Sequence, residues 1–247
     1  MKKTDFAWMR KRKGKRLSAI ELVVLLIVAV GFYIFYNYYG PGAAPHAVSV
    51  ADVPAYEGYA YAVINENQPL FSDEELVTDS YEFYSELDWL GRCGYAMASI
   101  GRDLMPTEDR ESISSVKPSG WEQAQYDIVE GRSLYNRCHL IGFQLTGENA
   151  NERNLITGTR YLNTTGMLPY ENMVTDYIKE TGNHVLYRVT PIYEGNNLVA
   201  SGVQMEGWSV EDQGEGICFH VYLYNVQPGV IIDYATGESR LGPGGAE

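Results

Sequence analysis

Apolar and polar residues alternate in several short stretches of the chain, as is typical of β-strands with one buried face. This pattern predicts strands over residues 59–64, 93–100, 133–142, 184–193, 198–205, 217–226 and 230–234. The turn-forming run Glu194-Gly-Asn-Asn197 separates two of them and indicates a hairpin. We therefore expect a core made of an antiparallel β-sheet.

A helical period replaces the alternation after Pro169. The apolar residues Met173, Val174, Tyr177 and Ile178 share one helical face, and the pattern stops at Gly182-Asn183. Residues 154–163 look like a loop that enters a short helix, which Gly166 interrupts. Together with the strands, these elements predict an α+β fold.

The N-terminus has a different pattern, a long apolar run without alternation. Residues 18–39 are long enough to cross a membrane as a helix, with tyrosines at one end. Eight of the first 16 residues are Lys or Arg, which predicts a cytoplasmic basic head over residues 1–17. We expect residues 18–39 to be a transmembrane signal anchor; the alternative is a signal peptide cleaved near the small residues 42–47, which would release the protein.

The remaining chain divides into a linker and one acidic domain. Residues 40–52 are rich in Pro, Gly and Ala and predict the linker, and residues 53–247 predict a single domain outside the cell. Of the 19 basic and 32 acidic residues, 11 and 30 lie beyond residue 40, so this part carries a formal charge of −19. Residues 102–160 are nearly neutral, with seven basic and nine acidic residues.

The three cysteines, Cys93, Cys138 and Cys218, include no C-x-x-C pair, which argues against a zinc site. Two possibilities stay open for them. A disulfide between Cys93 and Cys138 would suit an extracellular domain, and three free buried thiols would fit equally well.

The candidate chemistry centres on the run Asn136-Arg-Cys-His139, which lies between two apolar stretches. A neutral histidine can take a proton from water, as phosphodiester hydrolysis requires. In a strand, Arg137 and His139 would share one face, where the arginine suits a phosphate oxygen. Cys138 would point the other way, which argues against a Cys138–His139 nucleophilic pair.

Three polar residues downstream add to this cluster: Asn154, Asn163 and Glu171. Amide and carboxylate oxygens are ligands that Mg²⁺ prefers, and Mg²⁺ needs few of them because it keeps several waters. Each residue also has an ordinary structural interpretation, since a lone histidine often packs in a core and Asn or Glu often stabilises a helix start. The combination favours a metal-assisted hydrolytic site.

With these residues in place, the chain resembles the DNA/RNA non-specific endonucleases, the ββα-metal or His-Me finger nucleases. The Asn136–His139 run is similar to their Asp-Arg-Gly-His signature, and Asn163 and Glu171 match the spacing of their metal-binding helix. The likeness extends over residues 55–242 and is greatest to membrane-anchored or secreted DNA-entry nucleases of Gram-positive bacteria.

The resemblance implies a ββα-metal motif with defined roles. His139 would be the general base, Asn163 a direct Mg²⁺ ligand, Glu171 the holder of a magnesium-bound water, and Asn154 a support for the site. Arg137 completes the candidate catalytic set. Mg²⁺, or Mn²⁺ in its place, would be the cofactor, DNA and RNA the substrates, and no obligate protein partner is inferred.

Two departures from the signature leave an alternative open. Asn136 replaces the usual Asp and Cys138 the usual Gly. The acidity of the chain is also unusual for a protein that binds nucleic acid mainly through basic contacts. The alternative is therefore a catalytically inactive nuclease-like domain that serves as a surface binding module.

Overall fold

The computed structural model describes residues 24–31 and 46–243, and the chain divides into two compact units, Met1–Gly40 and Pro41–Glu247. In the first unit, residues 24–31 are helical. The rest of the expected membrane span over residues 18–39 lies outside the described residues, as does the basic head over 1–17. Within the described ranges, no helix has the length and apolar character needed to cross a membrane.

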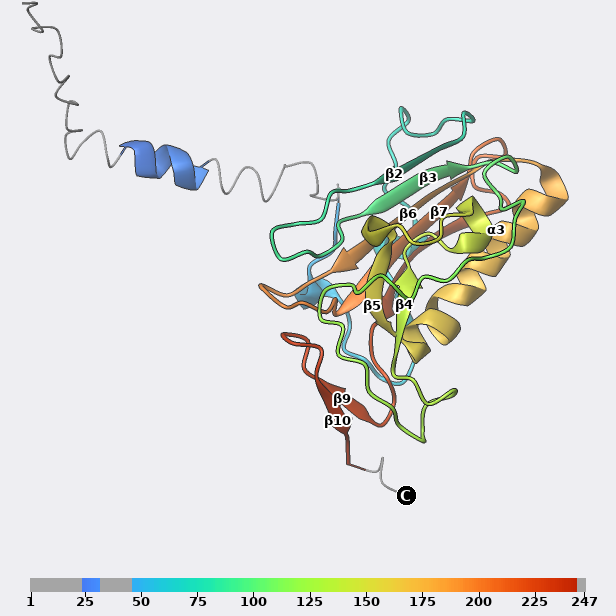
Figure 1. The fold of residues 1–247 in the computed structure, drawn as a ribbon. Coiled ribbons are helices and arrows are strands. Elements are labelled where there is room, and N and C mark those ends of the chain that lie inside the picture. Colours follow the sequence, from blue (N-terminus) through green and yellow to red (C-terminus); the bar gives the residue numbers. More distant parts are fainter. Residues whose placement is uncertain (1–23, 32–45, 244–247) are drawn as a thin grey trace, which may run out of the picture. The chain divides into compact units, whose positions relative to one another are not determined.

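The second unit is built on a six-stranded antiparallel sheet with the order β1-β8-β7-β6-β3-β2 (Figure 1). Its strands are β1 (Tyr61–Val63), β2 (Tyr81–Tyr84), β3 (Ala96–Ile100), β6 (Val185–Ile192), β7 (Gly202–Ser209) and β8 (Cys218–Tyr224). An antiparallel α+β fold was expected, and the structure confirms it.

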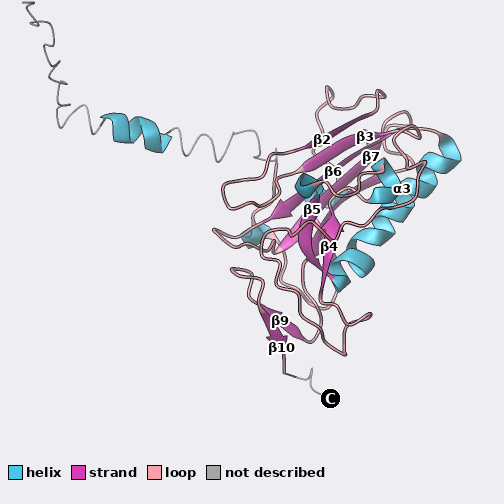
Figure 2. Cartoon of the chain, in the orientation of Figure 1, coloured by secondary structure: helices cyan, strands magenta, loops and turns pink. Residues whose placement is uncertain are grey.

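Two further strand pairs and several helices complete the unit (Figure 2). The strand pairs are β4 (Tyr135–His139) with β5 (Leu155–Thr159), and β9 (Val230–Ile232) with β10 (Ser239–Leu241). The α-helices are α2 (Phe143–Thr146) and α3 (Leu168–Thr181), and a π-helical segment, η4 (Leu162–Met167), leads directly into α3. Short 3-10 turns are η1 (Val50–Asp52), η2 (Asn65–Asn67) and η3 (Glu152–Asn154).

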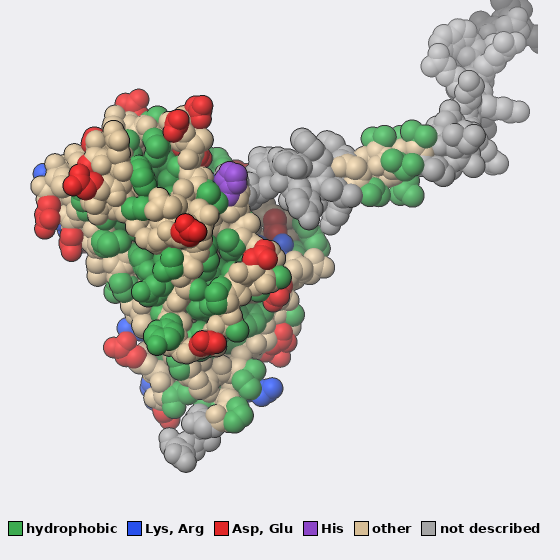
Figure 3. Space-filling model, turned by 180° about the vertical axis from the view of Figure 1, so that it is seen from behind, with side chains coloured by type: hydrophobic (Ala, Val, Ile, Leu, Met, Phe, Trp, Pro, Cys, Tyr) green, Lys and Arg blue, Asp and Glu red, His purple; other side chains and the backbone are tan. Residues whose placement is uncertain are grey.

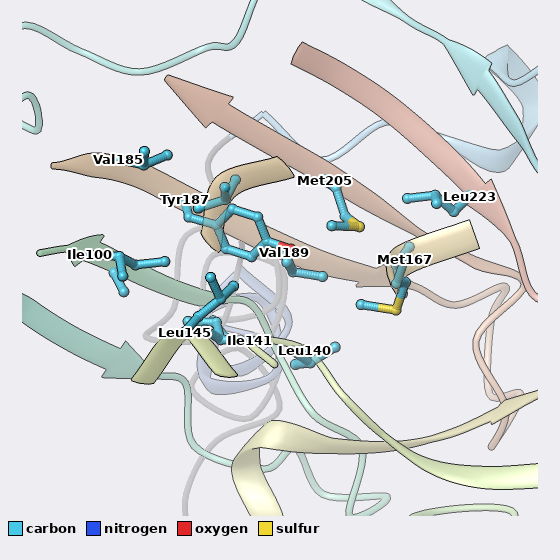
Figure 4. Packing of buried hydrophobic residues seen from close by; sticks show 14 of the residues in the cluster. Ile100, Leu140, Ile141, Leu145, Met167, Val185, Tyr187, Val189, Met205 and Leu223 are labelled. Atoms are coloured by element: carbon cyan, nitrogen blue, oxygen red, sulfur yellow. The ribbon is translucent and has the colours of Figure 1, made fainter. Parts of the chain in front are cut away.

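The main core lies between the large sheet and the layer formed by β4, β5, η4 and α3. Side chains from alternate positions of β6, such as Val185, Tyr187 and Val189, point into it because successive residues of a strand face opposite sides. Figure 4 shows Tyr187 and Val189 on the side of the core that faces Leu145 and Ile141 of the opposite layer. This packing fixes β4 and η4, which carry the candidate site residues, against one rigid support.

The opposite face of the sheet is covered by the N-terminal part of the unit. Arg188 and Glu206 form a fully buried ion pair there, with Nε to Oε2 at 2.7 Å, and Arg188 also donates to the Leu70 carbonyl. Val48 donates its backbone N–H to Gln204 on the same face. Residues 46–52, the end of the expected linker, are thus placed against the sheet.

No strand was expected at the positions of β2, β5 and β10, and β5 contradicts a prediction. Residues 154–163 were expected as a loop, but Leu155–Thr159 form β5. Thr157 and Thr159 are buried on the same face of β5 as Leu155, and Gly158 lies on the other face, so apolar and polar residues do not alternate along this strand. The strand β7 also begins later than expected, because Val199 and Ala200 are buried in an irregular segment.

Candidate active site

His139 is the last residue of β4, and it is 5% exposed. Its Nε2 lies 2.9 Å from the backbone carbonyl oxygen of Asn149, which can only accept, so Nε2 carries the proton. Nδ1 is then the acceptor, and the Arg110 Nη2 group lies 3.2 Å from it. The fold thus fixes the tautomer and leaves Nδ1 as the basic atom.

The surroundings of His139 keep its ring neutral. Burial lowers the pKa of His139 from its usual 6.5, and the charge of Arg110 lowers it further. The hydrogen bond to the Asn149 carbonyl acts in the opposite direction and is outweighed. At neutral pH the histidine is therefore available as a base.

Asn163 and Glu171 come from η4 and α3, and both line the same cavity as His139. The cavity has a volume of about 450 Å³ and is also lined by Arg110 and Arg137. Burial raises the pKa of Glu171 to about 7, although the charge of Arg110 opposes this. A buried carboxylate of this kind is stabilised when a cation binds beside it.

Gly142 allows the Glu171 carboxylate to occupy this position. A Cβ atom at residue 142 would lie 2.7 Å from Oε2 of Glu171, so a side chain there would displace the carboxylate from this position. The glycine that follows Leu140-Ile141 therefore has a direct steric reason at the site.

The donor set fits a hard divalent cation. Asn163 and Glu171 offer an amide and a carboxylate oxygen, and Mg²⁺ takes oxygen ligands while keeping several waters. Among residues 24–31 and 46–243, no three His, Cys, Asp or Glu side chains are placed to hold a metal ion together. An amide oxygen and a carboxylate oxygen are a donor set that suits Mg²⁺ or Mn²⁺, which need few protein ligands.

Asn154 does not line the cavity but is fully buried behind it. Its Oδ1 accepts from the Ile141 N–H at 2.9 Å and its Nδ2 donates to the Ile141 carbonyl at 3.0 Å. Its backbone oxygen accepts from Leu140. Asn154 therefore anchors the segment that follows His139 to η3.

Arg137 lines the cavity and holds a loop at its edge. Its Nη2 donates to the Ser114 carbonyl at 2.9 Å, and its Nε donates to the Val116 carbonyl. Its guanidinium carbon lies 4.2 Å from the centre of the Trp121 ring. In this arrangement the arginine orders residues 114–121.

Arg110 was not among the expected site residues. It belongs to the long polar segment 106–120, whose sequence shows which residues are charged but not which of them folds back over β4. A lone arginine in such a loop gives no periodic or spacing signal. The structure alone places it beside His139.

The two unusual residues of the motif lie in different surroundings. Asn136 lines the cavity, and its buried Nδ2 has no hydrogen-bond partner among the described residues. Cys138 is fully buried, and its thiol contacts Asn163 and Met167, not the His139 ring. Cys93, Cys138 and Cys218 are all free, so the Cys93–Cys138 disulfide is not formed.

Comparisons with known proteins find a matching family and similar structures. The family model of the DNA/RNA non-specific endonucleases matches residues 72–211. NucA from Streptococcus agalactiae with no metal bound has a similar structure, with a TM-score of 0.68 and 25% identity, over 78% of this chain and 92% of that chain. The same protein with a magnesium ion bound gives a TM-score of 0.68 at 24% identity, over 78% of this chain and 94% of that one.

A second nuclease is also similar. The structure of the Sda1 nuclease with a bound zinc ion has a TM-score of 0.55 and 32% identity, over 65% of this chain and 80% of that chain.

Proposed function

This chain belongs to the family of DNA/RNA non-specific endonucleases, and from that premise we propose that it is a Mg²⁺-dependent endonuclease that cleaves DNA and RNA without sequence preference outside the cell. The observation that carries the proposal is the cavity lined by His139, whose pKa is lowered by burial, together with Asn163 and Glu171.

His139 acts as the general base. Its Nε2–H stays on the Asn149 carbonyl, so Nδ1 takes the proton from the attacking water. Asn154 keeps the following residues in place and thereby fixes the position of the ring. Because the pKa of His139 is lowered, the base is ready at neutral pH.

When bound, the metal would be held directly by Asn163 and through a water by Glu171. Bound Mg²⁺ supplies charge stabilisation for the phosphoryl oxygens. The Arg110 guanidinium contacts Nδ1 of His139, the atom that must accept the proton. When substrate binds, the guanidinium therefore moves from Nδ1 to a phosphate oxygen. Arg137 shapes the cavity wall and adds positive charge near the strand.

Cleavage of supercoiled plasmid and of a structured RNA by the purified full chain tests this proposal. We expect nicking with Mg²⁺ or Mn²⁺, none in EDTA, and a loss of about 10²–10⁴ in rate for His139→Ala. His184→Ala is the matched control, because His184 pairs with Glu211 at 2.7 Å outside the cavity. A folded protein that binds nucleic acid without turnover under all these conditions would favour the inactive binding module.

We also propose that residues 18–39 anchor the enzyme in the membrane, with residues 1–17 in the cytoplasm and the nuclease domain, residues 53–247, outside. The apolar run and its basic flank support this topology. Protease added to intact cells should then remove the nuclease domain from a membrane-bound, full-length chain. A shortened protein in the medium would instead show cleavage near residues 42–47.

A further inference from the structure

We propose that Cys138 is a positioning residue of the metal site, whose thiol holds the side-chain amide of Asn163 in the orientation that metal binding requires. The inference rests on the proposed role of Asn163 as the metal ligand. It gives a function to a residue that departs from the usual family motif.

The contact between the two side chains is short, and its cysteine end is fully buried. The Cys138 Sγ lies 3.1 Å from the Asn163 Oδ1, and Cys138 has no exposed surface. Among the hydrogen bonds of residues 46–243, this is the one that the Asn163 side chain makes. Asn163 itself lines the cavity that holds His139 and Glu171.

A donor at this position selects one end of the amide. The two ends of an asparagine side chain have nearly the same shape, but the oxygen accepts hydrogen bonds and the nitrogen only donates them. A thiol hydrogen therefore favours the orientation in which Oδ1 faces Cys138. The oxygen has a second lone pair, which stays available for a cation, whereas the nitrogen offers none.

The neighbouring strand makes room for this thiol. A Cβ atom at Gly158 of β5 would lie 2.6 Å from the Cys138 Cβ and 3.2 Å from its sulfur. The Met167 sulfur, 3.4 Å from the Cys138 sulfur, closes the other side. Where the family usually has glycine at position 138, no side chain could make this contact, so the cysteine adds a fixed partner for the ligand.

The geometry excludes a nucleophilic role for the same residue. The Cys138 thiol does not line the cavity, and its contacts are Asn163, Met167 and the backbone of His139. Both ring nitrogens of His139 have other partners, Arg110 and Asn149. Cys138 therefore acts through Asn163 and has no contact with substrate.

Binding of Mn²⁺ to the full chain, followed by electron paramagnetic resonance without nucleic acid, tests the proposal. Cys138→Ala removes the donor and should weaken Mn²⁺ binding about tenfold, at the low end of what loss of such an outer partner costs. Cys138→Ser keeps a donor and should stay within about threefold of the wild type. Cys138→Gly is a second variant that lacks a donor, and it occupies less space in the core than Cys138→Ala.

Cys93→Ala is the matched control, because Cys93 is also buried and donates to the Leu155 carbonyl at 3.2 Å, away from the metal position. It should lower thermal stability and leave Mn²⁺ affinity unchanged. In an Asn163→Ala background, Cys138→Ala should have no further effect on Mn²⁺ binding, because it acts through that ligand.

Unchanged Mn²⁺ affinity in Cys138→Ala would overturn the proposal, and so would equal weakening in Cys138→Ser and Cys138→Ala, which would show a packing effect alone. A wild-type chain that binds Mn²⁺ in a Cys138-dependent way but does not cleave nucleic acid would refute the proposed function and leave this inference standing. A wild-type chain that binds no Mn²⁺ would overturn both.

Discussion

At the residue scale, the chemistry of His139 is set by what its two ring nitrogens contact. The Asn149 carbonyl fixes the proton on Nε2, and the Arg110 guanidinium both marks Nδ1 as the acceptor and disfavours a charged ring. Burial and Arg110 therefore have the same effect on the pKa, and each keeps the base unprotonated at neutral pH. Because of Arg110, the histidine depends on a residue from a distant, irregular part of the chain.

Replacing Arg110 by Gln should move the pH dependence of cleavage. Since the pKa of His139 is lowered from 6.5, kcat/KM of the wild type should be constant above about pH 6.5 and fall at lower pH, where the ring is protonated. Removing the positive charge raises this pKa, so the acid limb should shift to higher pH in Arg110→Gln. The pH profile of kcat/KM measures the shift.

Arg132→Gln is the control for this profile, because Arg132 is exposed and pairs with Asp127 outside the cavity. Its acid limb should match the wild type. An acid limb in Arg110→Gln that stays in place or moves to lower pH would contradict the assignment of Arg110.

Glu171 should make the metal-free protein less stable at neutral and basic pH. Its pKa is about 7 in the folded state, whereas a glutamate in water has an ordinary pKa of 4.5, so the folded state binds the proton more tightly. The stabilisation that the protonated side chain gives to the folded state is fully present below pH 4.5 and is lost as the pH rises through 7. Above that, the buried carboxylate costs at most about 3 kcal/mol, and less where solvent reaches it.

Glu171→Gln should therefore be more stable than the wild type at pH 8 in EDTA and equal to it near pH 4.5. Urea unfolding at the two pH values measures the difference, and added Mg²⁺ should stabilise the wild type more than the variant. A Gln variant that is the less stable protein at pH 8 in EDTA would show that the carboxylate is not destabilising there.

At the scale of elements, the β4–β5 pair and η4 bring the base and the metal donors together. β4 carries His139 and Cys138, β5 leaves room for the thiol at Gly158, and η4 presents Asn163. Cys138 and Gly158 are therefore complementary in size, since a side chain at both positions would overlap. The side chains at positions 138 and 158 must therefore match in size across the β4–β5 pair.

Gly158→Ala should destabilise the protein by about 1–3 kcal/mol, the usual cost of an extra methyl group in a full core. Adding Cys138→Gly to this variant removes the overlap and should recover most of the loss. Urea unfolding of the wild type, both single variants and the double variant gives the coupling directly. Additive effects of the two changes would show that the strands adjust independently of each other.

The same elements show what a sequence can and cannot reveal. The α3 helix and several strands of the large sheet have clear periodicity; in β6, for example, the apolar core residues Tyr187 and Val189 alternate with the buried polar residues Arg188 and Thr190. The strand β5 has Thr157 and Thr159 on the same face as Leu155 and shows no such alternation. His139, Asn163 and Glu171 could be brought into one site by motif spacing, and the structure places them in one cavity. The contacts of Arg110 and of Cys138 depend on tertiary packing and could not be predicted.

At the scale of the whole molecule, the distribution of charge opposes nucleic-acid binding outside the cavity. Residues 41–247 carry 11 basic and 30 acidic residues. On the face shown in Figure 3, acidic side chains are spread over the surface and basic ones are few. The cavity, by contrast, is lined by Arg110, Arg137 and Arg160. Substrate contacts should therefore be confined to a short stretch of strand around the scissile phosphate.

This confinement predicts a shallow dependence of binding on salt. Each phosphate neutralised on duplex DNA contributes a slope of about −0.9 in a plot of log Kobs against log salt concentration, so three arginines allow a slope of about −3 at most. Binding of His139→Ala to duplexes of unrelated sequence, measured by fluorescence anisotropy at several salt concentrations, gives the slope without cleavage. Arg160→Gln should reduce it by about one, because it removes one of the three phosphate contacts. A slope of about −6 or steeper would require a basic surface beyond the cavity, and an unchanged slope in Arg160→Gln would exclude this residue from contact with the backbone of the substrate.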